Sequence, residues 1–135
     1  MVWREPAAAP ASVVGPEGRD QCWQARLELG FERRDGKTVV AHRRHNGPLT
    51  IQKPFYPERS EICHVYLLHP PGGVAGGDAL ELEVAVSTGA HALITTPAAG
   101  KFYRCNDRTA SLRQNLSVQA GSTLEWLPQE TIVFE

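Results

Sequence analysis

Hydrophobic and polar residues alternate along the chain from Trp23 onward. In the first such stretch, single polar residues or glycine separate five apolar residues: Trp23, Ala25, Leu27, Leu29 and Phe31. A period of two predicts a β-strand with one buried face. Asp35-Gly36 comes next and predicts a hairpin turn, because glycine accepts a positive φ. The stretch 37–44 is then the expected return strand.

The rest of the chain adds further short strands. Residues 61–68 (EICHVYLL) are apolar on both faces, which predicts a strand in the middle of a sheet. Alternating apolar residues return at 80–86, 112–120 and 123–127. No long window shows the period of about 3.6 residues that marks an amphipathic helix. The pattern predicts an all-β chain with a turn about every 8–12 residues.

An internal similarity suggests how these strands are arranged. Two segments align without gaps at an offset of 32 residues: Val84, Val86, Gly89, Ala92 and Ile94 with Leu116, Val118, Gly121, Leu124 and Trp126. Such a repeat predicts stacked β-coils in a β-helical, solenoid-like arrangement rather than a closed barrel. Because only two copies are present, a chance similarity between two hairpins is the alternative.

The two ends of the chain depart from the strand pattern. Residues 1–20 predict a disordered leader, and Glu5, Pro6 and Pro10 interrupt any apolar run of the kind that a secretory signal needs. Residues 21–135 form the expected all-β domain. The chain ends within a strand-like run, 130–135 (ETIVFE), and a strand requires a neighbour. We therefore expect a truncated part of a longer protein.

Composition narrows the function classes. The 135 residues include 14 Lys+Arg and 15 Asp+Glu, a formal net charge of -1. Nucleic acids and anionic membranes require a clustered positive excess, so we expect neither as a partner. No apolar run reaches the roughly 20 residues that span a bilayer. Cys22, Cys63 and Cys105 are too few and too scattered for a disulfide scaffold, which indicates a soluble protein of the reducing cytoplasm.

A glycine-rich stretch, 69–78 (HPPGGVAGGD), is the first candidate for chemistry. Its successive amides suit an anion-binding nest. It lacks the GK[ST] of a phosphate-binding P-loop and the glycine spacing of a dinucleotide fingerprint. Two interpretations stay open: a long β-turn between strands, or a loop that contacts a partner or lines a ligand site.

A second stretch, 95–104 (TTPAAGKFYR), places Lys101 and Arg104 on either side of Phe102 and Tyr103. Aromatic residues and arginine contribute much of the binding energy of protein interfaces. The cluster is either an interface anchor or a strand whose aromatic side chains face the core.

Catalytic and metal-binding groups are scattered. The five histidines form no HExxH helix and no HxH pair, and no CxxC pair is present. Cys63 lies in an apolar strand, where burial disfavours the reactive thiolate. Four glutamates occupy outward strand positions typical of solvated charge: Glu81, Glu83, Glu125 and Glu130. These residues therefore form no constellation that names a reaction, and we expect no tightly bound cofactor.

Four segments of the chain together resemble the motifs of a known protein family. They are RRHNGPLTIQKPFYPE (43–58), HPPGGVAGGD (69–78), TTPAAGKFYR (95–104) and LPQETIVFE (127–135). In this order they resemble the urease accessory protein UreD family, called UreH in some bacteria. The resemblance runs from about Trp23 to the last residue. Family members are longer, so it implies that this chain is an N-terminal portion.

The resemblance implies a non-catalytic scaffold or chaperone with a β-helical fold. Members of this family bind the urease apoprotein subunits and UreF, and UreF recruits the GTPase UreG. The complex helps to insert nickel into the urease active site. The resemblance also implies a passage through the scaffold for the ion.

The matching motifs supply candidates for partner contact or for the lining of the passage. These are His69, Gly72, Gly73, Gly76, Gly77, Asp78, Lys101, Phe102, Tyr103, Arg104 and Glu130. His69 and Asp78 are also candidates for a transient nickel contact, because imidazole and carboxylate groups suit a weakly held ion. The alternative is a small β-sandwich or cupin-like domain whose glycine loop holds a ligand or a metal.

Overall fold

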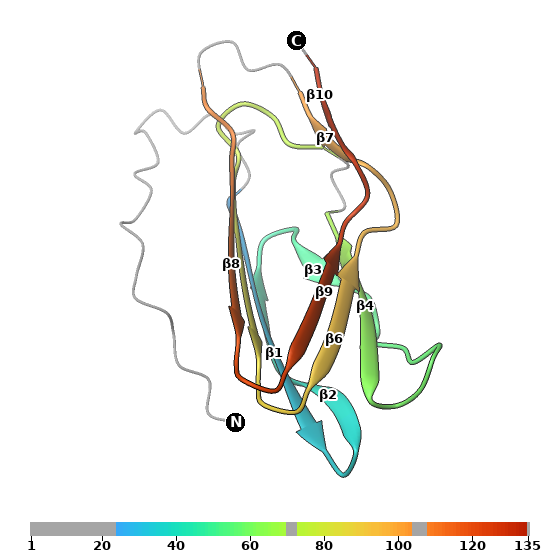
Figure 1. Ribbon diagram of the computed structural model, residues 1–135. Coiled ribbons are helices and arrows are strands. Elements are labelled where there is room, and N and C mark those ends of the chain that lie inside the picture. The colour runs from blue at the N-terminus through green and yellow to red at the C-terminus, as the bar shows by residue number, and fades with distance from the viewer. Residues whose placement is uncertain (1–23, 70–72, 104–107, 135) are drawn as a thin grey trace.

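The computed structural model describes residues 24–69, 73–103 and 108–134 (Figure 1). Within these ranges the chain forms ten strands and no helix, so the all-β prediction is confirmed. The strands are β1 (Gln24–Arg34), β2 (Lys37–Asn46), β3 (Thr50–Ile51), β4 (Ile62–Leu68), β5 (Ala79–Val86), β6 (His91–Thr95), β7 (Gly100–Phe102), β8 (Ser111–Val118), β9 (Thr123–Leu127) and β10 (Thr131–Val133). The described part accordingly contains no helix able to cross a membrane. The predicted leader, residues 1–20, lies outside it.

Two four-stranded sheets enclose the core. Their strand orders are β2-β1-β5-β8 and β3-β4-β6-β9, and β7 and β10 form a third, two-stranded sheet. The first pair of each large sheet is antiparallel, whereas every later pair is parallel. The chain therefore passes from one sheet to the other and returns one strand further along, as Figure 1 shows for β5, β6, β8 and β9.

The pairing of the later strands follows the internal sequence similarity. Leu80 lies beside Leu112 across β5 and β8, and Ala92 lies beside Leu124 across β6 and β9. The turns between the sheets also match, because Gly89 and Gly121 have φ values of 85° and 75°. The similarity thus corresponds to two coils stacked in register. A longer solenoid of such coils stays a prediction.

The core lies between the inward faces of the two large sheets. Leu27, Leu29 and Phe31 of β1 are fully buried against Val65 and Ile94 from the opposite sheet. Burying a side chain of this size stabilises the fold by about 1.5–3 kcal/mol. The alternation in the sequence therefore predicted the buried face of β1 correctly.

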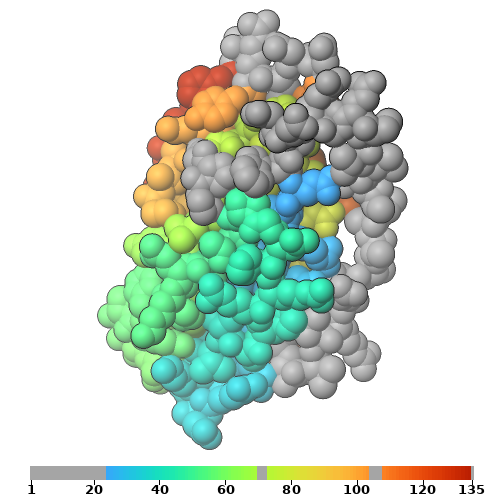
Figure 2. Space-filling view, turned by 180° about the vertical axis from the view of Figure 1, so that it is seen from behind, coloured from blue at the N-terminus to red at the C-terminus, as the bar shows by residue number. Residues whose placement is uncertain are grey.

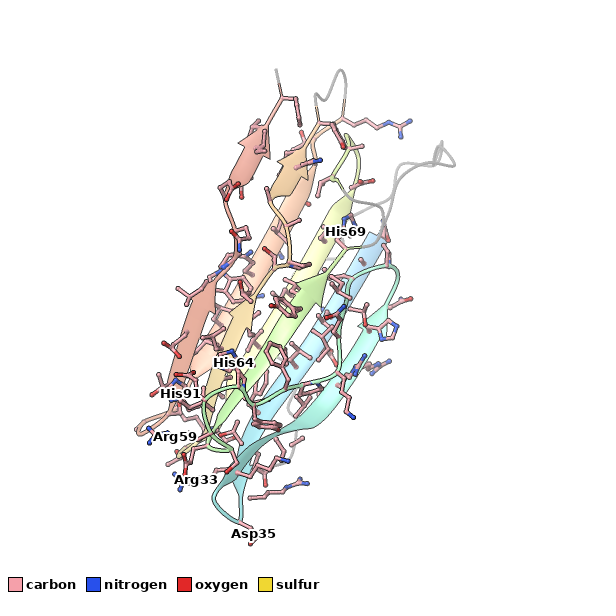
Figure 3. The ribbon with its side chains drawn as sticks, turned by 90° about the vertical axis from the view of Figure 1, so that its right-hand side faces the viewer. Arg33, Asp35, Arg59, His64, His69 and His91 are labelled. Atoms are coloured by element: carbon pink, nitrogen blue, oxygen red, sulfur yellow. The ribbon has the colours of Figure 1, made fainter. Side chains whose placement is uncertain are left out.

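The predicted hairpin and central strand are also confirmed. Asp35 and Gly36 have φ values of 51° and 75°, and they join β1 to β2 at the tip that Figure 3 labels. β4 lies between β3 and β6. Burial raises the pKa of the Cys63 thiol, which keeps it in its unreactive form.

One expectation about surface charge was wrong. Glu83 points away from the core, yet only 7% of it is exposed. Its register partners are Glu28 on β1 and Asn115 on β8, and these neighbouring side chains cover it. Asn115 Nδ2 donates a hydrogen bond of 2.7 Å to Glu83 Oε1. The outward face of this sheet is therefore an ordered polar layer, whereas Glu130 is exposed as expected.

Candidate functional site

Three of the sequence motifs meet at one place on the molecule. Val74 of the glycine-rich stretch bridges Phe102, and β7 pairs in parallel with β10. Backbone hydrogen bonds of 2.7 Å from Val74 N to Lys101 O and 2.9 Å from Gly100 N to Glu130 O join the three segments. We call residues 73–74, 100–103 and 130–134 the strand junction.

An aromatic stack lies on the strand junction. The rings of Tyr103 and Phe134 are 5.4 Å apart between centroids, at an interplanar angle of 21°. Gly73 leaves room for the Tyr103 ring, because a Cβ on residue 73 would lie 2.2 Å from Tyr103 Cε2. Both aromatic residues remain exposed. Phe134 was not singled out from the sequence, although it belongs to the matching segment 127–135.

A cavity of about 320 Å³ borders the strand junction. Its wall is mostly apolar and includes Leu49, Leu67, Val74, Leu80, Leu82 and Leu112. The polar side chains that line it are those of His69, Thr96, Lys101 and Gln114. The cavity thus draws its wall from both large sheets and from the start of the third.

His69 is a titratable residue of the cavity wall with a buried side-chain nitrogen. Figure 3 shows it just beyond β4, in the half of the molecule away from Asp35. Its Nε2 is buried and has no hydrogen-bond partner among the described residues. Burial lowers the pKa of His69 below its ordinary value, and the charge of Asp78 opposes this shift. The imidazole is therefore mainly neutral at neutral pH, with a nitrogen available to a ligand.

Asp78 stabilises the turn that precedes β5. It is almost fully buried, and its Oδ2 accepts a hydrogen bond of 2.8 Å from Ala75 N. Its own N–H donates to Ala75 O at 3.0 Å, and Gly77 has a φ of 90°. This part of the glycine-rich stretch is therefore a tight turn, as the structural interpretation of the sequence expected.

Those candidate residues that the structure describes divide into three groups. His69, Gly73, Lys101 and Phe102 line the cavity. Tyr103 and Glu130 lie on the strand junction outside the cavity wall, and Gly76, Gly77 and Asp78 form the turn. Gly72 and Arg104 lie outside the described residues.

The sequence did not identify most of the cavity wall. Leu80, Leu82 and Leu112 carry the ordinary signal of core strand positions, and Gln114 carries no signal at all. In the described ranges no group of three or more His, Cys, Asp or Glu residues is placed to hold a metal ion.

Fold and site together define a class of protein: an all-β stack of parallel coils with an apolar cavity beside a partly aromatic strand junction. The parallel pairing distinguishes it from the antiparallel β-sandwich and cupin alternatives. A family model described as UreD urease accessory protein matches residues 24–135. The chain therefore belongs to the UreD urease accessory protein family.

Curated relatives agree with this assignment. A urease accessory protein UreD of Azoarcus sp. (strain BH72) is 54% identical over 113 residues, which cover 84% of this chain and 40% of the relative. The UreD of Pseudomonas entomophila (strain L48) is 52% identical, with 92% of this chain and 44% of the relative covered. That of Klebsiella aerogenes is 54% identical, with 83% and 41% covered. The chain thus spans less than half the length of these relatives.

Proposed function

We propose that this chain is a non-catalytic scaffold of urease maturation in the cytoplasm. In this role it binds the urease apoprotein subunits and UreF, with the GTPase UreG attached through UreF, and it helps to insert nickel into the urease active site. Membership of the UreD family supports the general role. The observation that carries the finer proposal is that three family-matching motifs meet beside one cavity.

The strand junction is the proposed partner contact. Tyr103 and Phe134 are each 45% exposed although their rings are stacked on each other. Lys101 is exposed beside them, and no ion pair of its side chain occurs within the described ranges. A stacked aromatic pair next to a cation has the composition of an interface hot spot.

The cavity is the proposed route for nickel as cargo. A mostly apolar wall offers few competing ligands, and His69 presents a buried nitrogen that no described residue engages. A single imidazole holds a divalent ion weakly, and transport requires binding that is weak enough to permit release. Asp78 supports this site through its charge near His69 rather than as a lining residue.

Complementation of urease activation tests the proposal. The chain is expressed with a urease gene cluster that lacks its own UreD gene, and urease activity and urease-bound nickel are measured in the lysate. We expect His69→Ala to lower both by roughly tenfold, equivalent to about 1.4 kcal/mol. We expect Lys101→Glu to weaken co-elution with UreF in size-exclusion chromatography, because it reverses the charge at the strand junction.

His45→Ala is the matched control, because His45 is an exposed histidine on β2 that does not line the cavity. It should activate urease like the unmodified chain. If the unmodified chain neither activates urease nor co-elutes with UreF, this 135-residue chain does not act as the proposed scaffold. Equal activity of the His69→Ala and His45→Ala variants would remove the cavity from the nickel route.

A further inference from the structure

The turn between β2 and β3 requires a glycine at residue 47. Gly47 has a φ of 82°, and a Cβ on it would lie 2.4 Å from the backbone oxygen of Gln24. Any other residue would therefore be strained and short of room. The residue before it, Asn46, is exposed at the end of β2. Figure 2 shows the stretch coloured cyan to green, which includes this turn, spread across one face of the molecule. The fold thus fixes a glycine directly after an exposed asparagine.

An asparagine followed by glycine has a route to lose its side-chain amide without an enzyme. The backbone nitrogen of the glycine loses its proton and attacks Cγ of the asparagine. The new N–Cγ bond closes a cyclic succinimide, and the bond from Cγ to the side-chain nitrogen breaks, so that ammonia leaves. Water then opens the ring at Cγ to give aspartate, or at the main-chain carbonyl carbon to give isoaspartate. Glycine favours the attack because it has no Cβ beside the attacking nitrogen.

The side chain of Asn46 is not held in place by the fold. Its amide makes no hydrogen bond among the described residues, and Gly47 lies outside the strands. The end of a strand also opens at little cost in free energy, which lets Cγ approach the glycine nitrogen. Asn115 is the contrast within the same chain. Its Nδ2 donates a hydrogen bond of 2.7 Å to Glu83 Oε1, and the larger Leu116 follows it.

Cationic side chains lie around the position of the new carboxylate. Asn46 lies opposite Arg26 across β1 and β2, and the side chain of Arg44 is on the same face of β2. These residues line a cavity of about 110 Å³ together with Glu28 and His45. Glu28 is already paired with Arg26 at 3.3 Å, whereas Arg44 forms no ion pair among the described residues. A carboxylate at residue 46 would therefore have an unpaired guanidinium beside it.

We propose that Asn46 deamidates spontaneously in the folded chain, with the nitrogen of Gly47 as the nucleophile, and that Arg44 and Arg26 stabilise the aspartate product. The isoaspartate product has a different effect, because it adds a methylene group to the main chain at residue 46. Leu49 follows in this connection and is 3% exposed, and β3 begins directly after it. The longer main chain loosens this packing. The inference rests on the structure alone and not on the proposed function.

Peptide mapping by mass spectrometry tests the proposal on the complete folded chain, sampled during incubation at neutral pH. Trypsin separates Asn46 and Asn115 into the peptides 45–59 and 114–135, and fragment ions assign each mass change to a residue. At Asn46 we expect the exchange of amide for acid, in two products of equal mass that chromatography separates. At Asn115 it should be slower by roughly tenfold or more, the factor equivalent to a hydrogen bond to a charged group. The rate at Asn46 should rise in proportion to hydroxide concentration, because the attacking nitrogen must lose its proton.

Two variants separate the reaction from its consequence. Asn46→Gln should remove the mass change at residue 46, since glutamine must close a larger ring. Asn46→Asp should raise the thermal midpoint of unfolding slightly in low salt. This gain should disappear in high salt, because salt screens exposed ion pairs.

Three results would count against the proposal. The peptide 45–59 could keep its mass in the folded chain while the chain unfolded in urea gains it, and the fold would then protect Asn46. Equal rates at Asn46 and Asn115 would overturn the proposal as well, because neither the glycine nor the free amide would matter. A lower thermal midpoint of Asn46→Asp in low salt would overturn the stabilising role of Arg44 and Arg26.

Discussion

At the scale of single residues, Gly73 of the glycine-rich stretch leaves the room that the ring of Tyr103, in the second stretch, occupies. A Cβ at this position would lie 2.2 Å from Tyr103 Cε2, so Gly73→Ala must displace the ring. The displaced ring loses its stack on Phe134. Because the exposed ring can move aside, we expect the cost to be that of the lost aromatic pair, about 0.5–1.5 kcal/mol in the free energy of unfolding. Urea denaturation followed by fluorescence measures it.

The matched comparison is the same substitution in a Tyr103→Ala background. With the ring removed, Gly73→Ala meets no obstacle and should cost little. The two costs should therefore differ by most of the single-variant effect, as a double-mutant cycle reports for residues in contact. Equal costs in the two backgrounds would show that Gly73 is needed for a reason other than room for the ring.

At the scale of strands, one buried hydroxyl joins β2 to β6 and to the segment just before β4. Thr38 on β2 is fully buried, and its Oγ1 donates to Glu61 O at 2.6 Å and accepts from His91 N at 3.0 Å. Thr38→Val keeps the shape but leaves both backbone groups without this partner. Because each buried unsatisfied group costs about 1–3 kcal/mol, we expect a loss of roughly 2–4 kcal/mol in the free energy of unfolding.

Thr88→Val is the control for this prediction. Thr88 is exposed in the turn between β5 and β6, so its hydroxyl stays hydrated whether or not it bonds. Its replacement should change the unfolding midpoint in urea by an amount typical of surface sites, about 0.5 kcal/mol or less. A Thr38→Val variant as stable as Thr88→Val would contradict the structural role of the buried hydroxyl.

The strands were predictable because their signals are local. Neighbouring positions alone reveal the alternation in 23–31 and the Asp35-Gly36 turn. The stacking of β5 on β8 was predictable because the sequence repeats at an offset of 32 residues. The burial of Glu83 could not be predicted from the sequence. Glu28 and Asn115 come from distant parts of the chain, and they lie beside Glu83 only when the coils stack. The cavity escaped prediction for the same reason. His69 was a candidate through the family resemblance, but its buried nitrogen is visible only in the structure.

At the scale of the whole molecule, stacking aligns side chains in columns that run through the coils. One inward column consists of Leu27, Leu82 and Gln114, and the neighbouring outward column consists of Glu28, Glu83 and Asn115. Gln114 is the polar member of the inward column, and it lines the cavity. In the outward column, Asn115 donates a hydrogen bond to the buried Glu83. These adjacent residues of β8, both exposed, therefore lie on opposite faces of the sheet and have different neighbours.

Leucine at these two positions should consequently change stability in opposite directions. Gln114→Leu adds an apolar side chain at the rim of the cavity, and because residue 114 is still exposed we expect a gain of no more than about 0.5 kcal/mol in the free energy of unfolding. Asn115→Leu leaves the Glu83 carboxylate without its donor, and we expect a loss of about 1–2 kcal/mol. Thermal unfolding of both variants at one protein concentration measures the difference. Strand propensity and added apolar area change similarly in the two variants. Shifts of the same sign would therefore contradict the assignment of the two residues to different columns. Opposite shifts would confirm that stacking, rather than strand composition, sets the environment of each residue.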